Sequence, residues 1–178
     1  MTISTDVEIE RKFLVREASL KAAENITLTE IESVYLNHSK ISTLGVNHGL
    51  TLQDSEAPLE RRVTKRETDS IVKYFLTLKL GGQTLSRVES EIEIDEQAYK
   101  YMGDNFGESV VNKKRFTFDY ANNTFELDVF PDVRLLLMEI ELSDEKQLFE
   151  LPPFVRIVRD VTGDKRFYSS NLGQPLTT

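Results

Sequence analysis

Acidic and basic side chains recur at a spacing of two residues in several short segments of this chain. Near the start, in VEIERKFLV, Glu8, Glu10 and Lys12 follow this spacing. Side chains two apart in a β-strand project from the same face of that strand. Carboxylate oxygens suit hard divalent cations such as Mg²⁺ or Mn²⁺, whereas Lys and Arg bind phosphate oxygens. A face that carries both therefore suits a polyphosphate bound together with divalent metal ions.

The same spacing returns in six further segments, where it alternates with apolar residues. The charged faces are Glu60, Arg62 and Arg66; Lys79 beside Thr77; Arg87, Glu89, Glu91 and Glu93; Lys113 and Arg115; Glu126 and Asp128; and Glu139 and Glu141. The simpler interpretation is an ordinary half-buried sheet whose charged face points to solvent. Antiparallel neighbours would then place many like charges side by side, which is unfavourable. We therefore expect these faces to converge on an enclosed cavity.

The hydrophobic pattern predicts about eight strands joined by short turns. They are expected near 6–15, 26–37, 58–67, 71–80, 85–94, 109–120, 123–130 and 134–142, with turns at Gly81-Gly82 and Asn122-Asn123. Short helices are expected at 17–24, at 95–106 behind the N-cap Asp95, and near 153–160, with a last ordered piece near 165–171 and a long loop, interpreted as an insertion, at 38–57. Consecutive strands with short turns pair antiparallel, and a sheet of this size removes its edges by closing. The predicted fold class is α+β, mostly β: a closed eight-stranded antiparallel barrel.

Composition narrows the class of protein. The chain has 178 residues, no cysteine and a formal net charge of −8. This length suits one domain, here residues 1–178. The absence of cysteine excludes disulfides and thiolate sites and favours a reducing cytoplasm. The acidic balance and the lack of a long apolar run argue against nucleic acid and membranes as partners.

Several segments resemble, in order, the motifs of the CYTH or triphosphate tunnel metalloenzyme family. VEIERKFLV resembles the E-x-E-x-K signature that opens the CYTH domain, and SRVESEIEI resembles the R-x-E-x-E strand of the family. FLTLK, KKRF, FELDVF and MEIEL resemble further strands, and FELPPFV with VTGDKRFYSSNL resembles the closing segment. The resemblance covers about residues 7–172 and implies a tunnel of eight antiparallel strands that holds a triphosphate.

The resemblance also implies roles for individual residues. It assigns metal binding, by Mg²⁺ or Mn²⁺, to Glu8, Glu10, Asp128, Glu139 and Glu141, with Glu126 as a further candidate. It assigns phosphate binding to Lys12, Arg62, Lys79, Arg87, Lys113, Arg115 and Arg166, the last in preference to Lys165. Glu10, Lys12, Arg62 and Lys79 are expected to carry the reaction. The family often has R-x-R in the third strand where this chain has Glu60 before Arg62, so either Arg66 compensates or Arg61 faces inward.

The expected function is metal-dependent hydrolysis of inorganic triphosphate. EIERKFLV and FELPP resemble the inorganic triphosphatase branch. Class IV adenylate cyclase activity and hydrolysis of thiamine or another organic triphosphate are alternatives on the same fold. A second alternative is a polyphosphate or nucleotide binder without catalysis, and a third is a plain β-domain with charged outer faces.

Overall fold

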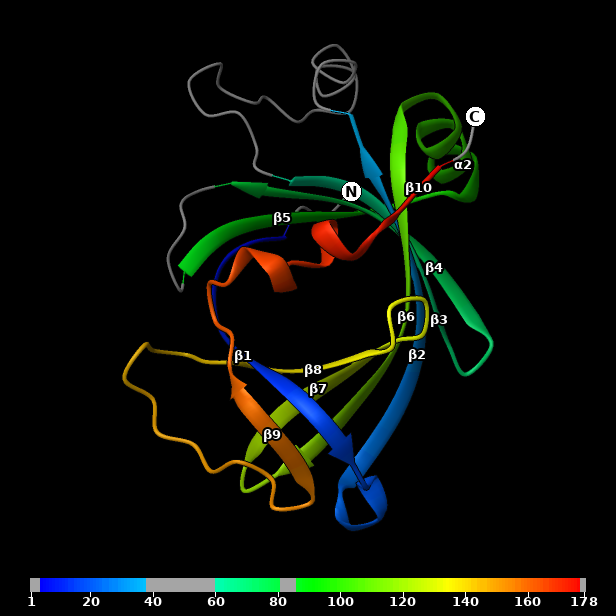
Figure 1. The fold of residues 1–178 in the computed structure, drawn as a ribbon. Coiled ribbons are helices and arrows are strands. Elements are labelled where there is room, and N and C mark those ends of the chain that lie inside the picture. Colours follow the sequence, from blue (N-terminus) through cyan, green and yellow to red (C-terminus); the bar gives the residue numbers. More distant parts are fainter. Residues whose placement is uncertain (1–3, 38–59, 81–85, 177–178) are drawn as a thin grey trace.

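The computed structural model describes residues 4–37, 60–80 and 86–176. Within these ranges the chain forms one large β-sheet, one α-helix and three short 3₁₀ helices (Figure 1). The elements are β1 (Ser4–Ala18), η1 (Leu20–Ala22), β2 (Glu24–Leu36), β3 (Glu60–Thr68), β4 (Ile71–Leu80), β5 (Ser86–Ile94), α2 (Glu96–Phe106), β6 (Gly107–Tyr120), β7 (Asn123–Phe130), β8 (Leu135–Glu141), β9 (Val155–Asp160), η2 (Lys165–Phe167), η3 (Ser169–Leu172) and β10 (Gln174–Pro175).

All strand pairings in the sheet are antiparallel. The strand order is β10-β6-β2-β3-β4-β5-β1-β8-β7, β9 pairs with β1, and β6 also pairs with β7. The expectation of a mostly β, antiparallel chain is confirmed. The ten strands assigned in the described ranges exceed the eight expected, because the last part of the chain contributes β9 and β10.

Two buried apolar clusters lie on the strand faces opposite the charged ones. The first is covered by the segment after β8 through Phe149 and Phe154, and the second by α2 through Tyr99 and Met102. A third cluster, which includes Val111 and Val161, lies on the cavity side and is completed by η2 and η3. Peripheral segments therefore shield the apolar side of the sheet, which leaves the charged side free to face inward.

Two expected helices differ in the structure. The segment near 153–160 is strand β9, because its backbone pairs with the end of β1. The segment 17–24 keeps only the three-residue helix η1. The helix behind Asp95 is confirmed: its carboxylate accepts from the Ala98 N–H at 2.7 Å, which caps the first turn.

The hairpin between β6 and β7 turns one residue earlier than expected. Ala121 and Asn122 are its central residues, with φ of 48° and 61°. Two positive φ values are typical of the tight turn whose twist matches the flanking strands. The expected loop at 38–57 and the Gly81-Gly82 turn lie outside the described residues.

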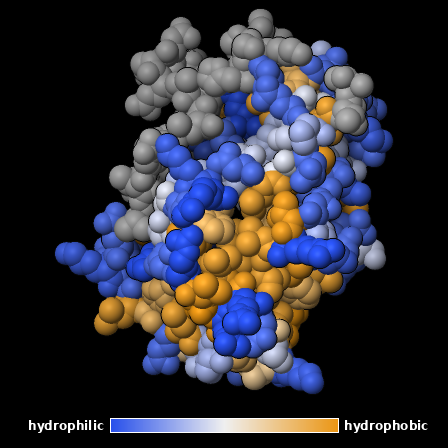
Figure 2. Space-filling view, in the orientation of Figure 1, coloured by the Kyte–Doolittle hydropathy of each residue, from blue (hydrophilic) through white to orange (hydrophobic). Residues whose placement is uncertain are grey.

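Apolar side chains also gather on the outer surface. Figure 2 shows them on the front face, in the region where β1, β8 and β9 lie. Val158 in β9, for example, is 55% exposed. In the described part of the chain, no helix is both long and apolar enough to span a membrane.

We predict that Phe118→Ala lowers the free energy of unfolding by about 3–5 kcal/mol, because it opens a cavity in a packed core. Phe118 is fully buried and contacts the rings of Phe125 and Phe154 at centroid distances of 5.8 Å each. Urea denaturation measures the change. Leu148→Ala is the control, since Leu148 is 94% exposed and its truncation should leave the midpoint where it is. Equal midpoints for both variants would show that this cluster does not stabilise the sheet.

Candidate active site

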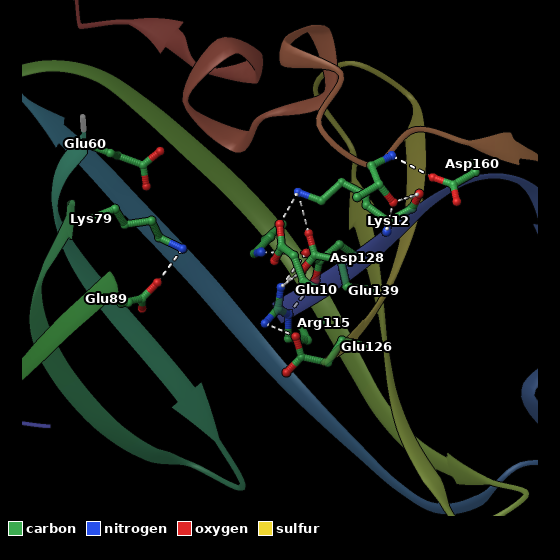
Figure 3. Close-up of polar contacts among 12 residues, drawn as sticks. Glu10, Lys12, Glu60, Lys79, Glu89, Arg115, Glu126, Asp128, Glu139 and Asp160 are labelled. Atoms are coloured by element: carbon green, nitrogen blue, oxygen red, sulfur yellow. Dashed lines mark hydrogen bonds and ion pairs between the residues drawn. The ribbon is translucent and has the colours of Figure 1, made fainter. Parts of the chain in front are cut away.

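A cavity of about 490 Å³ lies on the charged side of the sheet. This volume falls within the range of small-molecule sites, about 300–1,000 Å³. Its wall carries acids, bases and hydroxyl groups from eight strands, β1 to β8, and from the segment around η3 (Figure 3). The lining residues are Glu10, Lys12, Thr29, Ile31, Ser33, Tyr35, Glu60, Arg62, Thr64, Arg66, Lys79, Glu89, Glu91, Val111, Lys113, Arg115, Thr117, Glu126, Glu139, Glu141, Tyr168 and Ser169.

Strand register brings the charged side chains into contact across neighbouring strands. Glu10 lies opposite Glu141 and Lys12 opposite Glu139 in the β1–β8 pair. Arg115 lies opposite Asp128 in the β6–β7 pair. Side chains alternate along each strand, so these residues face the cavity while neighbours such as Phe13, Leu127 and Ile140 pack in a core on the other side.

Arg115 is the centre of a dense ion-pair cluster on one wall. Its Nε and Nη2 donate to the Asp128 carboxylate at 2.6 and 2.7 Å, and Nη2 also donates to Glu139 at 2.9 Å. Its Nη1 forms an ion pair with Glu126. Lys113 Nζ lies 2.6 Å from Asp128. One guanidinium thus joins three carboxylates.

Lys12 extends this cluster toward the start of β1. Its Nζ lies 2.8 Å from Glu139 and 3.6 Å from Glu10. Lys12 is buried, with only 5% of its surface exposed. Its ammonium group therefore sits among carboxylates inside the cavity wall.

A second cluster lies on the facing wall, formed by β3, β4 and β5 (Figure 3). Arg62 Nη1 donates to Glu60 at 3.1 Å, and Lys79 forms an ion pair with Glu89. Arg66 binds Glu91 through two hydrogen bonds, of 2.9 and 2.6 Å. Its guanidinium also lies 4.3 Å from the centroid of the Phe75 ring, which holds it in place from a second side.

Burial and opposite charge compete in setting the pKa values of the first cluster. Burial opposes ionisation of Asp128, but Arg115 and Lys113 outweigh it and lower the pKa of the carboxyl. Burial likewise opposes ionisation of Glu139, and Lys12 and Arg115 hold its pKa well below the ordinary value. Burial raises the pKa of Glu126 despite Arg115. Neighbouring carboxyls in one wall therefore differ in proton affinity.

The structure places most of the sequence-derived site residues in the cavity wall. Glu10, Lys12, Arg62, Lys79, Lys113, Arg115, Glu126, Glu139 and Glu141 line it. Asp128 is fully buried behind the wall, held by Lys113 and Arg115. Arg62 faces the cavity while Arg61 is buried on the opposite face, and Arg66 also lines the cavity, which answers the question about the third strand.

Arg166 is the exception among the phosphate-binding candidates. Its side chain is 75% exposed and pairs with Asp164 at 2.7 Å, and it is absent from the cavity wall. The 3₁₀ turn η2 orients it outward, and Tyr168 and Ser169 reach the cavity instead. Glu8 and Arg87 lie in described strands, but their side chains are outside the described part.

Sequence reasoning did not assign several residues that line the cavity. Alternation placed Glu89 and Glu91 on the same strand face as Arg87, but no metal or phosphate role was assigned to them, and both line the cavity. Tyr35 gave no signal, because an isolated Tyr in a strand is usually core. It is buried in the wall opposite Arg62, and burial raises its pKa to about 12, so its hydroxyl stays neutral.

The cavity acids have the oxygen donors that a divalent cation prefers, but they are not already arranged around one metal position. In the described ranges, no three acidic or histidine side chains converge closely enough to hold a metal. However, Glu10 lies directly opposite Glu141, and Glu126 directly opposite Glu139. Like charges in such pairs repel unless a cation lies between them. Arg115 supplies this positive charge to Glu126 and Glu139.

Three comparisons place the chain among known proteins. No family profile matches it. An inorganic triphosphatase of Acetivibrio thermocellus is 35% identical over 106 residues, which are 56% of this chain. The match spans 65% of that relative, so the chain covers just under two thirds of its length.

The structures agree over a longer range. The crystal structure of the inorganic triphosphatase NE1496 superposes with a TM-score of 0.56 at 27% identity, over 96% of this chain and 97% of that one. PH1819 of Pyrococcus horikoshii OT3 shares the fold, with a TM-score of 0.57 at 20% identity, over 78% and 80% of the two chains.

The fold and the cavity define an antiparallel β protein with an acid- and base-lined interior. The chain is similar to inorganic triphosphatases, in part of its sequence to that of Acetivibrio thermocellus and in its fold to NE1496.

We predict that Asp128→Asn lowers the free energy of unfolding by about 3–5 kcal/mol at neutral pH, because it leaves buried cations without their partner. The folded-state pKa values of Asp128 and Glu139 are lowered. The stability that these two carboxylates contribute is therefore fully present above about pH 4, the pKa of a carboxyl in the unfolded chain. It is lost as the pH falls through their pKa values in the folded state. Urea titrations between neutral and acidic pH should show a shallower acid loss in the variant than in the wild type.

Glu30→Gln is the matched control for this titration. Glu30 forms an exposed ion pair with Lys114 on the outside of the sheet. The pKa of Glu30 is lowered by Lys114, but the pair is exposed and screened by solvent, so this variant should stay much closer to the wild-type pH dependence than Asp128→Asn. If Asp128→Asn stayed equally close to it, the ion-pair cluster would not be what stabilises this wall.

Proposed function

We propose that this chain is a metal-dependent hydrolase that converts inorganic triphosphate and water into diphosphate and orthophosphate within the cavity. The observation that carries the proposal is the convergence of Lys12, Arg62, Lys79, Lys113 and Arg115 with seven glutamates on one enclosed space. The similarity to two inorganic triphosphatases over the ranges given above supports the same substrate.

The cavity belongs, in this proposal, to a closed eight-stranded tunnel within a single domain. The support comes from β6, whose residues Lys114 to Asp119 pair with β2 along one edge and with β7 along the other. The remaining pairings link β2 to β7 through β3, β4, β5, β1 and β8. A wall without an edge keeps charged side chains away from bulk water.

Phosphate binding falls to the basic residues on both walls. Lys79 approaches the space from one side, and Lys12 and Arg115 approach it from the other (Figure 3). Arg62 and Lys113 line the same cavity. Each is engaged by a carboxylate in this structure, through pairs such as Lys12–Glu139 and Arg62–Glu60. Triphosphate oxygens would replace part of these contacts with charge-assisted hydrogen bonds of the same kind.

Metal binding falls to the acids of β1, β7 and β8. Glu10, Glu139 and Glu141 line the cavity from adjacent strands, with Glu126 next to Glu139, and Mg²⁺ and Mn²⁺ match their oxygen donors. When bound, the metal supplies Lewis-acid polarisation of the phosphate and neutralises its charge. Asp128, with its lowered pKa and two cationic partners, acts by holding Lys113 and Arg115 in the wall.

The chemistry left to the protein is positioning and charge stabilisation. The basic side chains hold the terminal phosphoryl group in line with a water molecule. The water oxygen forms a bond to the terminal phosphorus, the bridging P–O bond breaks, and diphosphate leaves. A cavity carboxylate accepts the proton of the water, and Lys and Arg stabilise the developing charge on the leaving oxygen.

We predict that phosphate release from triphosphate stops when a chelator removes divalent metal and returns when Mg²⁺ or Mn²⁺ is added. Glu141→Gln should lower the activity about 10²-fold or more, as expected for loss of a charged group acting in the transition state. A malachite-green assay with inorganic triphosphate, ATP and thiamine triphosphate measures turnover and substrate choice. Activity that persisted in chelator, or full activity of Glu141→Gln, would contradict the proposed metal site. Binding of triphosphate without turnover would favour a non-catalytic binding protein.

We predict that Arg62→Ala raises KM for triphosphate about 10- to 100-fold, the effect of losing a hydrogen bond to a charged group. Arg156→Ala is the matched control, because Arg156 forms an exposed pair with Glu17 outside the cavity. Initial-rate kinetics on both variants checks this. Identical KM values would show that Arg62 does not contact the substrate.

A further inference from the structure

The edge of β1 that faces β5 and β9 has a gap between its two described pairings, beside the catalytic candidates. Described pairing with β5 runs to Ile9, and pairing with β9 begins at Phe13. Glu10 and Lys12 lie between these two points. Among the described residues, neither β5 nor β9 pairs with β1 at these two positions.

The segment after β9 fills this gap at Lys12. The Lys12 N–H donates to the Thr162 hydroxyl at 3.0 Å, and the Val161 N–H donates to the Lys12 carbonyl at 2.8 Å. The Thr162 hydroxyl also lies 3.5 Å from that carbonyl. A side chain thus takes the place of a backbone partner.

Thr162 is itself held on both sides. Its N–H donates to the Asp160 carboxylate at 2.8 Å, and Asp160 accepts from Arg11 Nε at 3.1 Å. Its neighbour Val161 is 2% exposed and packs in the third apolar cluster. Thr162 is therefore held in place, and it connects the apolar cluster around Val161 to the backbone of Lys12.

We propose that Thr162 is a positioning residue for the reaction, acting through Lys12. The proposal rests on the proposed function, because it assumes that Lys12 binds triphosphate. With its backbone fixed between Glu139 on β8 and Thr162 on the other edge, Lys12 has its Nζ directed at the cavity (Figure 3). Misplacement by about 1 Å costs up to 10²-fold in rate, so the hydroxyl has a measurable effect on turnover.

The test compares Thr162→Val, which keeps shape but removes the hydroxyl, with Thr162→Ser, which keeps the hydroxyl. We expect kcat/KM for triphosphate to fall about 10- to 100-fold in the Val variant and to stay within about threefold in the Ser variant. Thr124→Val is the matched control, since the Thr124 hydroxyl donates to Asp119 at 2.7 Å on an exposed surface away from the cavity. Full activity of Thr162→Val would overturn the proposal.

A double-variant cycle separates positioning from general destabilisation. In a Lys12→Ala background, Thr162→Val should cause no further loss of kcat/KM, because its effect passes through Lys12. A loss as large as in the wild-type background would show that Thr162 acts by another route. Should Thr162→Val not fold, Asp160→Ala loosens Thr162 and the same outcomes apply to it. Arg11→Ala is then the control, because it removes only the ion pair between Asp160 and β1.

Amide hydrogen exchange makes failure of this proposal distinguishable from failure of the proposed function. The Lys12 amide should exchange about tenfold faster or more in Thr162→Val than in Thr162→Ser, whatever the chain hydrolyses. An unchanged exchange rate would show that the Thr162 hydroxyl does not hold the Lys12 backbone in place. If the Lys12 amide exchanged faster in Thr162→Val but the wild-type protein released no phosphate from triphosphate, the proposed function would be wrong. The positioning role of Thr162 in that reaction would be wrong with it.

Discussion

The structure depends on the mutual neutralisation of charges that face an enclosed cavity. A buried charge is costly unless it is paired and hydrogen-bonded. Arg115 meets this condition by joining Asp128, Glu139 and Glu126, while Lys12 and Lys113 pair with the same carboxylates. Because these side chains share partners, the loss of one member changes the charge balance of the others.

This arrangement is the reverse of that in most small β proteins, where apolar side chains face the interior and charged side chains face solvent. The charged faces of the strands point to the inside of the sheet, and the apolar faces need cover from outside. Helix α2 and the segment around Phe149 and Phe154 provide it. The peripheral elements are therefore a condition for the cavity, because without them the apolar faces would be exposed to water.

The same pairing prepares the cavity for a charged ligand. Cations and carboxylates of the wall already hold each other in place, and the proposed ligand, a triphosphate with metal ions, presents both signs of charge. The ligand can therefore exchange for existing partners instead of being inserted beside unpaired charges, which keeps the cost of desolvation low.

Alternation in the sequence predicted the strands and the faces of Glu10, Lys12, Lys113, Arg115, Glu139 and Glu141, because side-chain direction in a strand follows parity alone. The segment 153–160 was predicted as a helix, since its pairing with β1 is a long-range contact that local pattern does not encode. Arg166 was placed in the site by resemblance, whereas a local turn directs it to solvent.

By itself, the sequence determined which residue types share a strand face and hence the chemistry of that face. Tertiary structure decided which faces meet: that Asp128 lies behind the wall, that Tyr35 joins it, and that Thr162 reaches Lys12 across 150 residues of sequence. The physical reason is the sequence separation over which each interaction acts. Strand parity is set by neighbouring residues, whereas burial and register are set by packing between segments far apart in the chain.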